Sequence, residues 1–120
     1  MKITVEYNQV HNYLVGKFIG TMEPKHVGEY AQEILKLARI HDCKRFLNDM
    51  RETEMKLSIA DLYYASAEAA VEDFDRSWKR AVLVKEKTKE IEFYEITAKN
   101  KGLDVRTFDN FDEALAWLVL

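Results

Sequence analysis

The stretch from Lys44 to Tyr64, KRFLNDMRETEMKLSIADLYY, decides the predicted fold. Its apolar start predicts a short strand that ends on Asn48 and Asp49, and a charged loop follows. Ser58 then opens a predicted helix, because the apolar residues after it recur at helical spacing. A carboxylate therefore lies at the carboxyl end of a strand, and a hydroxyl lies at the start of the next helix. Open α/β sheets place ligand and partner sites at such strand ends, so this stretch predicts where a functional surface lies.

Strands and helices alternate on both sides of this stretch. Apolar patterns predict strands over 3–7, 13–19, 45–49, 81–84 and 105–108, and helices that begin near residues 24, 58, 89 and 111. Strands separated by helices run parallel through right-handed crossovers, and the opening hairpin adds an antiparallel strand. We therefore predict a single α/β domain over residues 1–120 with the order β-β-α-β-α-β-α-β-α. Its sheet is mixed, mostly parallel and five-stranded, and four helices cover it.

The composition is that of one ordinary soluble domain. The chain has 120 residues, of which 48% are hydrophobic, so it can build a core without disulfides. The net charge is −3 and lysines alternate with acids, which excludes the basic stripe of a nucleic-acid-binding protein. The single cysteine, Cys43, fits a reducing compartment. Apolar runs are too short for a membrane-embedded protein and residues 1–6 do not resemble a signal peptide, so we predict a cytoplasmic location.

Two strand-end motifs and the order of elements carry a family resemblance. Residues 20–23, GTME, are similar to a strand-end glycine followed by an apolar residue and an acid. The segment from Asn48 to Ser58 is similar to a strand-end acid followed, after a loop, by a serine at a helix start. Nearly the whole chain thus resembles the STAS family, the anti-sigma-factor antagonist-like fold. Residues 102–120, with the helix FDEALAWL, resemble a divergent and mostly uncharacterised STAS-like branch.

The resemblance implies that Ser58 is the position whose phosphorylation switches partner binding. The family usually has Asp-Ser-Ser-Gly at this helix start, whereas residues 57–60 read LSIA, so only the serine matches. From the residues alone, Ser58 is a helix N-cap, and Asp61 completes a capping box of the acidic kind. The two interpretations are compatible, because a phosphate at a helix N-terminus is electrostatically favourable.

We expect the functional surface to be a strand-end rim, defined as Thr21, Asp49, Arg51, Ser58 and Glu86. Parallel crossovers bring the carboxyl ends of the second, third and fourth strands to the same end of the sheet. Loops at that end can vary while the sheet holds them in place. The backbone donors of the helix that begins at Ser58 can also meet an anion there.

Other groups of reactive side chains do not match a known site. The carboxylates of Asp49, Glu52 and Glu54 are ligands that hard cations prefer. Their D-x-x-E-x-E spacing matches no metal motif, so a solvated acidic loop is the favoured interpretation, and we predict no metal and no cofactor. The three histidines lack the short spacing of a ligand pair, and Cys43 has no histidine base placed by a motif.

Three functions stay open on this evidence. The leading one is a non-catalytic regulatory or protein-interaction module, because no nucleophile–base pair is present in a known motif. The second is a binder of a small anionic or lipid-like ligand, using aromatic residues of the helix over 58–74 and the lysines at 85, 87 and 89. The third is an enzyme with Asp49 as general base, which would need a raised pKa on that carboxyl and a deep pocket.

The C-terminal helix predicts a weak homodimer. Its expected inward face consists of Phe111, Ala114, Leu115 and Leu118. Trp117, Val119 and Leu120 are then left on other faces, and an exposed apolar cluster usually marks a contact. The alternative is that Trp117 folds back over the edge of the sheet.

Overall fold

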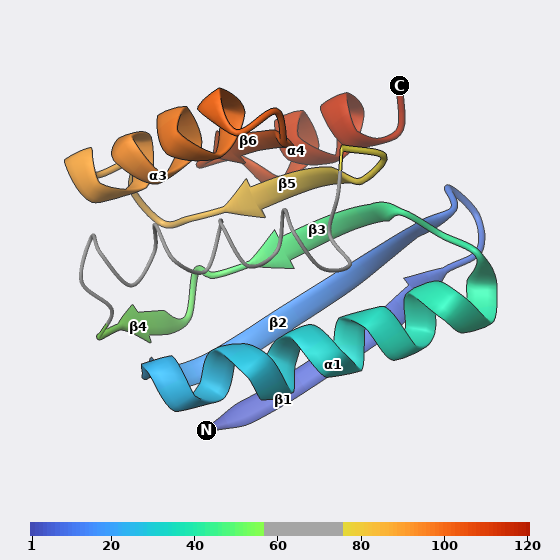
Figure 1. Ribbon diagram of the computed structural model, residues 1–120, viewed down its shortest axis with the longest axis horizontal. Coiled ribbons are helices and arrows are strands. Elements are labelled where there is room, and N and C mark those ends of the chain that lie inside the picture. The colour runs from blue at the N-terminus through green and yellow to red at the C-terminus, as the bar shows by residue number, and fades with distance from the viewer. Residues whose placement is uncertain (57–75) are drawn as a thin grey trace.

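A six-stranded mixed sheet organises the computed structural model, which describes residues 1–56 and 76–120 (Figure 1). The elements are β1 (Lys2–Asn8), β2 (Tyr13–Met22), α1 (Pro24–His41), β3 (Arg45–Asp49), β4 (Thr53–Met55), β5 (Lys79–Leu83), α3 (Lys89–Asn100), β6 (Asp104–Phe108) and α4 (Phe111–Leu118). The main strand order is β1-β2-β3-β5-β6, and β4 pairs with β2. β1 is antiparallel to β2, and all other pairs are parallel. The helix predicted over 58–74 lies outside the described residues.

The predicted α/β architecture is confirmed, and the predicted count of five strands is wrong. The additional strand, β4, is only three residues long and pairs with the end of β2, which continues to Met22 instead of ending at Ile19. Gly20 has a φ of +116°, a backbone conformation that side chains disfavour, at the point where β2 begins to pair with β4. Three residues are too few for an alternating pattern, so the sequence carried no signal for β4.

Side-chain alternation places helices on both faces of the sheet. Phe46 of β3 pairs with Arg80 of β5, so Val82 lies on the same face as Phe46. Phe46 packs with α1 and Val82 packs with Ala98 of α3, so these two helices share what we call the α1 face. Leu47 points to the opposite side, the α4 face, where it packs with α4. Figure 1 shows α1 along β1 and β2, and α3 and α4 near β5 and β6.

The helices bury most of the residues that their spacing predicts. In α1, helical spacing predicts an apolar face that includes Tyr30, Ile34, Leu35 and Ala38, and all four are buried. In α3, helical spacing allows either Ile96 or Ala98 to face inward; Ala98 is buried and Ile96 is 58% exposed. In α4, Ala114 and Leu118 are buried, but Phe111 is 38% exposed. Phe111 is the first residue of its helix, and its predicted place in the core is therefore wrong.

Trp117 packs back on the sheet, which is the second of the two predicted alternatives. Its ring lies 5.8 Å from that of Phe108 between centroids, and the Lys79 ammonium lies 4.5 Å from its centroid. Lys79 also donates a hydrogen bond to the Trp117 carbonyl. Leu120 remains 87% exposed. A homodimer through the C-terminal helix stays a prediction, with Leu120 rather than Trp117 as its most exposed apolar residue.

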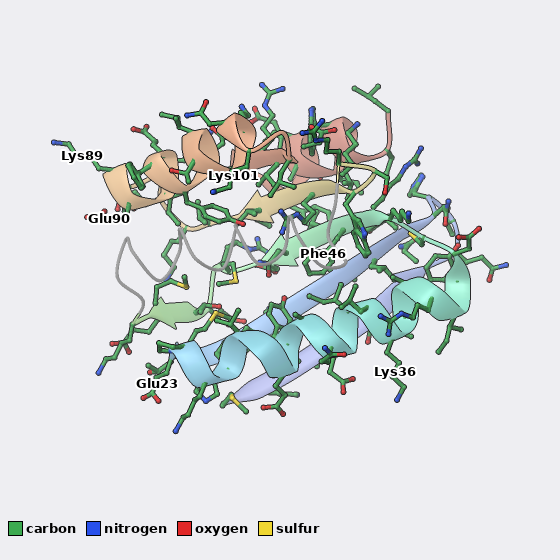
Figure 2. All side chains as sticks on the ribbon, in the orientation of Figure 1. Glu23, Lys36, Phe46, Lys89, Glu90 and Lys101 are labelled. Atoms are coloured by element: carbon green, nitrogen blue, oxygen red, sulfur yellow. The ribbon has the colours of Figure 1, made fainter. Side chains whose placement is uncertain are left out.

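Gly16, in the middle of β2, allows two aromatic rings to approach the backbone on the α1 face. Tyr30 of α1 and Phe46 of β3 meet edge to face over it, with centroids 6.3 Å apart. The Tyr30 hydroxyl donates to Asn48 Oδ1 at 2.7 Å. Figure 2 places Phe46 in the interior of the molecule, beside β3. Aromatic cover of this kind compensates for the side chain that a strand glycine lacks.

The outer edge of β6 is capped by a carboxylate from α3. Glu95 Oε1 accepts a hydrogen bond from the Thr107 backbone N–H and a second one from the Thr107 hydroxyl at 3.2 Å. Thr107 is buried, so these donors do not have free access to water. The Lys99 ammonium lies 3.8 Å from Glu95 Oε2. An edge strand with unpaired donors invites pairing with another chain, and this contact removes one such donor.

We expect Glu95→Ala to lower the free energy of unfolding by about 1.5 kcal/mol, because it leaves two buried donors of Thr107 without their acceptor. Urea denaturation followed by circular dichroism measures this change. Glu92→Ala is the matched control, since Glu92 is an exposed glutamate of the same helix and should change stability by less than about 0.5 kcal/mol. Equal effects of the two substitutions would show that the cap on β6 contributes nothing.

Candidate functional site

Asp49 ends β3 with its carboxylate held by the backbone and side chain of Arg51. Arg51 Nε donates to Oδ1 at 3.0 Å and Arg51 Nη2 donates to Oδ2 at 2.9 Å, so both carboxylate oxygens are bound. The Arg51 backbone N–H donates to Oδ1 at 3.1 Å, which closes a tight turn directly after the strand. Asp49 is only 6% exposed, whereas the Arg51 side chain is 44% exposed. The pair therefore fixes the start of the loop and presents a guanidinium to solvent.

The pKa of the Asp49 carboxyl lies below its ordinary value. Burial raises this pKa, but hydrogen bonds from the Arg51 side chain and backbone, together with the charges of Arg51 and Lys17, outweigh burial and lower it. Asp49 is therefore ionised at neutral pH and already paired. A general base would need the opposite shift, so the described geometry does not give Asp49 the property that the enzymatic interpretation required.

A second ion pair lies beside the first one. Lys17 of β2 is directly opposite Asp49 in the pairing of β2 with β3, on the α4 face. Its ammonium contacts Glu52 Oε2 at 2.7 Å. The hydrogen bond with Glu52 is the main cause that raises the pKa of Lys17. Two cations and two carboxylates thus alternate across the end of the sheet, and neither sign of charge dominates there.

Contacts with β2 hold the rest of the loop. The Thr53 hydroxyl donates to the Phe18 carbonyl, and the Gly20 N–H donates to the Glu52 carbonyl at 3.1 Å. The Thr21 hydroxyl donates to Glu54 Oε2 at 3.3 Å. These bonds come from Glu52, directly before β4, and from Thr53 and Glu54 within it, and they connect this part of the loop to β2. Asp49, Glu52 and Glu54 therefore turn to three different partners and do not converge on one point.

The structure brings together two of the five residues of the predicted strand-end rim, Asp49 and Arg51, which are hydrogen-bonded to each other. Thr21 lies further along β2, beyond Lys17, the strand partner of Asp49, and its hydroxyl is bonded to Glu54. Glu86 is exposed in the loop after β5. This loop lies at the same end of the sheet, where the Met50 N–H donates to the Leu83 carbonyl at 2.8 Å. Among the described residues, no hydrogen bond or salt bridge joins Glu86 or Thr21 to the Asp49–Arg51 pair. Ser58 lies outside the described residues.

Sequence reasoning missed the polar pair beneath this surface. Helical spacing places Tyr30 in the core and the sequence places Asn48 at a strand end, but neither pattern predicts the hydrogen bond that joins their side chains on the α1 face. Burial, and then the negative charge of Asp49, raise the pKa of the Tyr30 hydroxyl, which is therefore a neutral donor. The available signal was alternation, because consecutive strand residues such as Asn48 and Asp49 must point to opposite faces.

The remaining candidates from the sequence are the cysteine thiol and the possible metal ligands. Cys43 is 2% exposed, and its sulfur lies 3.6 Å from the Asn12 carbonyl oxygen. Within residues 1–56 and 76–120, no group of three or more histidine, cysteine, aspartate or glutamate side chains is arranged to hold a metal ion. No helix in that same part of the chain has the length and apolar character needed to cross a membrane.

Comparison with known proteins identifies a likeness in fold. No protein-family model matches the chain, and no curated protein matches it significantly. Among solved structures, the chain is similar to an uncharacterized protein from Shewanella loihica, described as a DUF3478 family protein with a SpoIIAA-like fold. The two share 18% sequence identity with a TM-score of 0.62, over 98% of this chain and 92% of that chain. At this identity the likeness establishes the fold alone. The chain has a SpoIIAA-like, that is STAS-like, fold, as its order of elements predicts.

Proposed function

We propose that the chain is a non-catalytic regulatory or protein-interaction module of the STAS-like type, acting through the strand-end rim around Asp49 and Ser58. The observation that carries the proposal is the anchored loop between β3 and residue 56. The Arg51–Asp49 pair holds its start, and pairing of β4 with β2 holds its end. A surface that is ordered before it meets its partner loses less entropy on binding.

The exposed chemistry of this loop suits recognition of a protein. Arg51 and Glu52 expose 44% and 54% of their side chains, so charges of both signs face solvent within one short segment. Mixed charges at a rim set partner choice and association rate more than affinity. The loop leads directly to Ser58 in the chain. A phosphate there would add a charge of about −2 to a stretch of sequence that also carries Arg51 and Lys56, and so change which partner fits.

The alternative function, a binder of a small anionic or lipid-like ligand, shares this end of the sheet. Lys85, Lys87 and Lys89 are exposed, and the Lys87 ammonium lies 6.0 Å from the centroid of the Phe108 ring. The aromatic residues that the alternative also needs, Tyr63, Tyr64 and Phe74, lie outside the described residues. The capture experiment that tests the proposed function therefore also detects bound small molecules.

We expect capture of a protein partner from lysate of the source cells to depend on the strand-end rim. Ser58→Asp and Glu86→Lys should each reduce capture by roughly tenfold, because a misplaced charge at an interface weakens binding, and a tenfold loss corresponds to only about 1.4 kcal/mol. Mass spectrometry of the retained protein and of extracted small molecules gives the readout.

Asp104→Lys is the matched control for Glu86→Lys. Asp104 is an exposed acid at the amino end of β6, the opposite end of the sheet. Capture that responds equally to both lysine substitutions would reflect net charge alone and would contradict the proposal. Retention of a lipid or an anion by the wild type, without any protein that responds to the rim substitutions, would favour the alternative function.

A further inference from the structure

The two edge strands of the sheet, β6 and β1, differ in whether their outward backbone groups are covered. At β6, Glu95 caps the outward N–H of Thr107. At the other end of the strand order lies β1, which pairs with β2 on one side and with no described strand on the other. β1 is seven residues long and rich in residues that favour strands. A strand of this length with an open edge can extend the sheet into another chain.

The side chains of β1 divide cleanly between the two faces. Ile3 and Val5 pack against the core under α1 but remain half-exposed. Lys2, Thr4 and Glu6 alternate with them, point to the other face and are exposed. Within the described part of the chain, neither Lys2 nor Glu6 forms a salt bridge. The edge thus combines unpaired charges of opposite sign with apolar side chains that are only partly covered.

We propose that β1 pairs antiparallel with β1 of a second copy of this chain, around a two-fold axis at Thr4. Each Lys2 then faces Glu6 of the second copy, each Ile3 faces Val5, and the two Thr4 side chains face each other. Opposite charges and threonine pairs across antiparallel strands are both stabilising. A two-fold interface requires such a self-complementary pattern, and it makes one continuous sheet through both copies.

The position of α1 is compatible with this pairing. α1 packs on both β1 and β2, so its axis lies over that pair of strands. Neighbouring strands are about 4.8 Å apart, so the two α1 helices across the new junction would lie roughly 10 Å apart. That separation is close to the distance at which helices pack against each other. The second α1 helix therefore fits beside the first one without displacing either strand.

The charges on β1 favour one register over the others. Charged residues on an edge strand can also serve to prevent pairing. Charges of a single sign would prevent pairing in every register, but β1 carries a positive charge at Lys2 and a negative charge at Glu6. A parallel, in-register pair would place Lys2 against Lys2, and an antiparallel pair centred on Ile3 or Val5 would leave the charges unmatched. Only the register centred on Thr4 pairs both charges.

A charge-swap series measured by sedimentation velocity at low salt tests the proposal. Lys2→Glu and Glu6→Lys should each raise the dimer dissociation constant roughly tenfold, because each converts two attractive cross-strand pairs into repulsive ones. The double substitution, which exchanges the two charges, should restore the wild-type value. Lys36→Glu is the control, since Lys36 extends from the outer surface of α1 (Figure 2) and should leave the constant unchanged.

A cysteine cross-link tests the register directly. Residues that face each other across antiparallel strands have Cα atoms about 4.5–5.5 Å apart, within reach of a disulfide. Thr4→Cys should therefore cross-link rapidly on mild oxidation, while Glu6→Cys should not, because two Glu6 residues would be separated by roughly 13 Å along the strands. The native Cys43 is buried and should not compete.

Three results would overturn the proposal. One is a monomeric mass at every concentration up to about 1 mM, which would place the dimer dissociation constant above that concentration. Another is equal cross-linking of the two cysteine variants. The third is a dimer that Leu120→Glu disrupts and the charge variants leave intact, which would place the interface at the C-terminal helix instead of β1.

Discussion

Gly16→Ala is expected to lower the free energy of unfolding by about 3 kcal/mol, at the upper end of the usual cost of overpacking. A Cβ atom at this position would lie 2.5 Å from the Tyr30 hydroxyl oxygen and 2.8 Å from two carbons of the Phe46 ring. Both rings are buried, and β2 is held between β1 and β3 at this residue. Neither the rings nor the strand can move without breaking contacts. Urea denaturation gives the size of the loss.

A double-mutant cycle with Tyr30→Phe separates the two clashes. Tyr30→Phe alone should cost about 1 kcal/mol through the lost hydrogen bond to Asn48. In combination with Gly16→Ala it also removes the oxygen that the new methyl group meets, so the double variant should be more stable than the sum of the single effects predicts. Strict additivity would show that the clash lies with Phe46 alone.

Gly28→Ala is the control for the glycine itself. Gly28 lies in α1, and a Cβ atom there would meet nothing within 4 Å. Alanine is a better helix former than glycine, so this substitution should stabilise the protein by about 0.5–1 kcal/mol. Opposite signs at the two glycines would establish that the cost at Gly16 comes from its neighbours. A loss at Gly16 below about 0.5 kcal/mol, the range of neutral surface changes, would refute the tight packing over β2.

The architecture was predictable because its signals are local and repeated. Ile3 and Val5 alternate with polar residues, α1 carries one apolar stripe, and the run at 81–84 is apolar throughout. The alternation and the stripe each match one kind of element, the run at 81–84 is too short for a helix, and the element order then leaves few topologies. The structure places β5 at Lys79–Leu83, two residues earlier than the predicted start and one earlier than the predicted end. Such shifts are common, since polar residues often begin buried strands.

The missed features depend on contacts between distant segments. Nothing near Gly16 in the sequence indicates that rings from α1 and β3 will meet above it. β4 exists because its backbone meets β2, at Gly20, Thr21 and Met22, and not because of its own three side chains. Asp49 was correctly placed at a strand end, but its role depends on Arg51 folding back onto it. Spacing of two residues allows that contact in a turn and does not require it.

The second large effect is expected at the ion pair of Asp49 and Arg51. Asp49→Ala should lower the free energy of unfolding at neutral pH by about 2.5 kcal/mol, the range for hydrogen bonds to a charged group. The substitution removes both acceptors of the Arg51 guanidinium and the acceptor of its backbone N–H. The variant loses the buried carboxylate, whereas the Arg51 side chain is already half-exposed and its guanidinium can be hydrated. This hydration limits the loss in free energy of unfolding. Asp49→Asn keeps the shape without the charge and should show most of the same loss.

The pH dependence of this loss identifies its electrostatic part. The pKa of Asp49 is lowered in the folded protein from its ordinary value of 3.8. The unfolded state therefore binds the proton more tightly, and the charged carboxylate stabilises the fold fully only above pH 3.8. That contribution should disappear as the pH falls from 3.8 through the lower pKa of the folded state. Below this window, wild type and Asp49→Asn should approach equal stability.

Denaturation curves of both proteins at a series of pH values give this difference directly. Asp104→Asn provides the matched control, because Asp104 is an exposed aspartate at the opposite end of the sheet. Its substitution should give a small difference from wild type that stays flat across the same window. If the difference between wild type and Asp49→Asn is also flat, Arg51 does not stabilise the ionised carboxylate, and the loop after β3 must be held by β4 alone. The strand-end rim would then lack the ordered start on which the proposed partner surface depends.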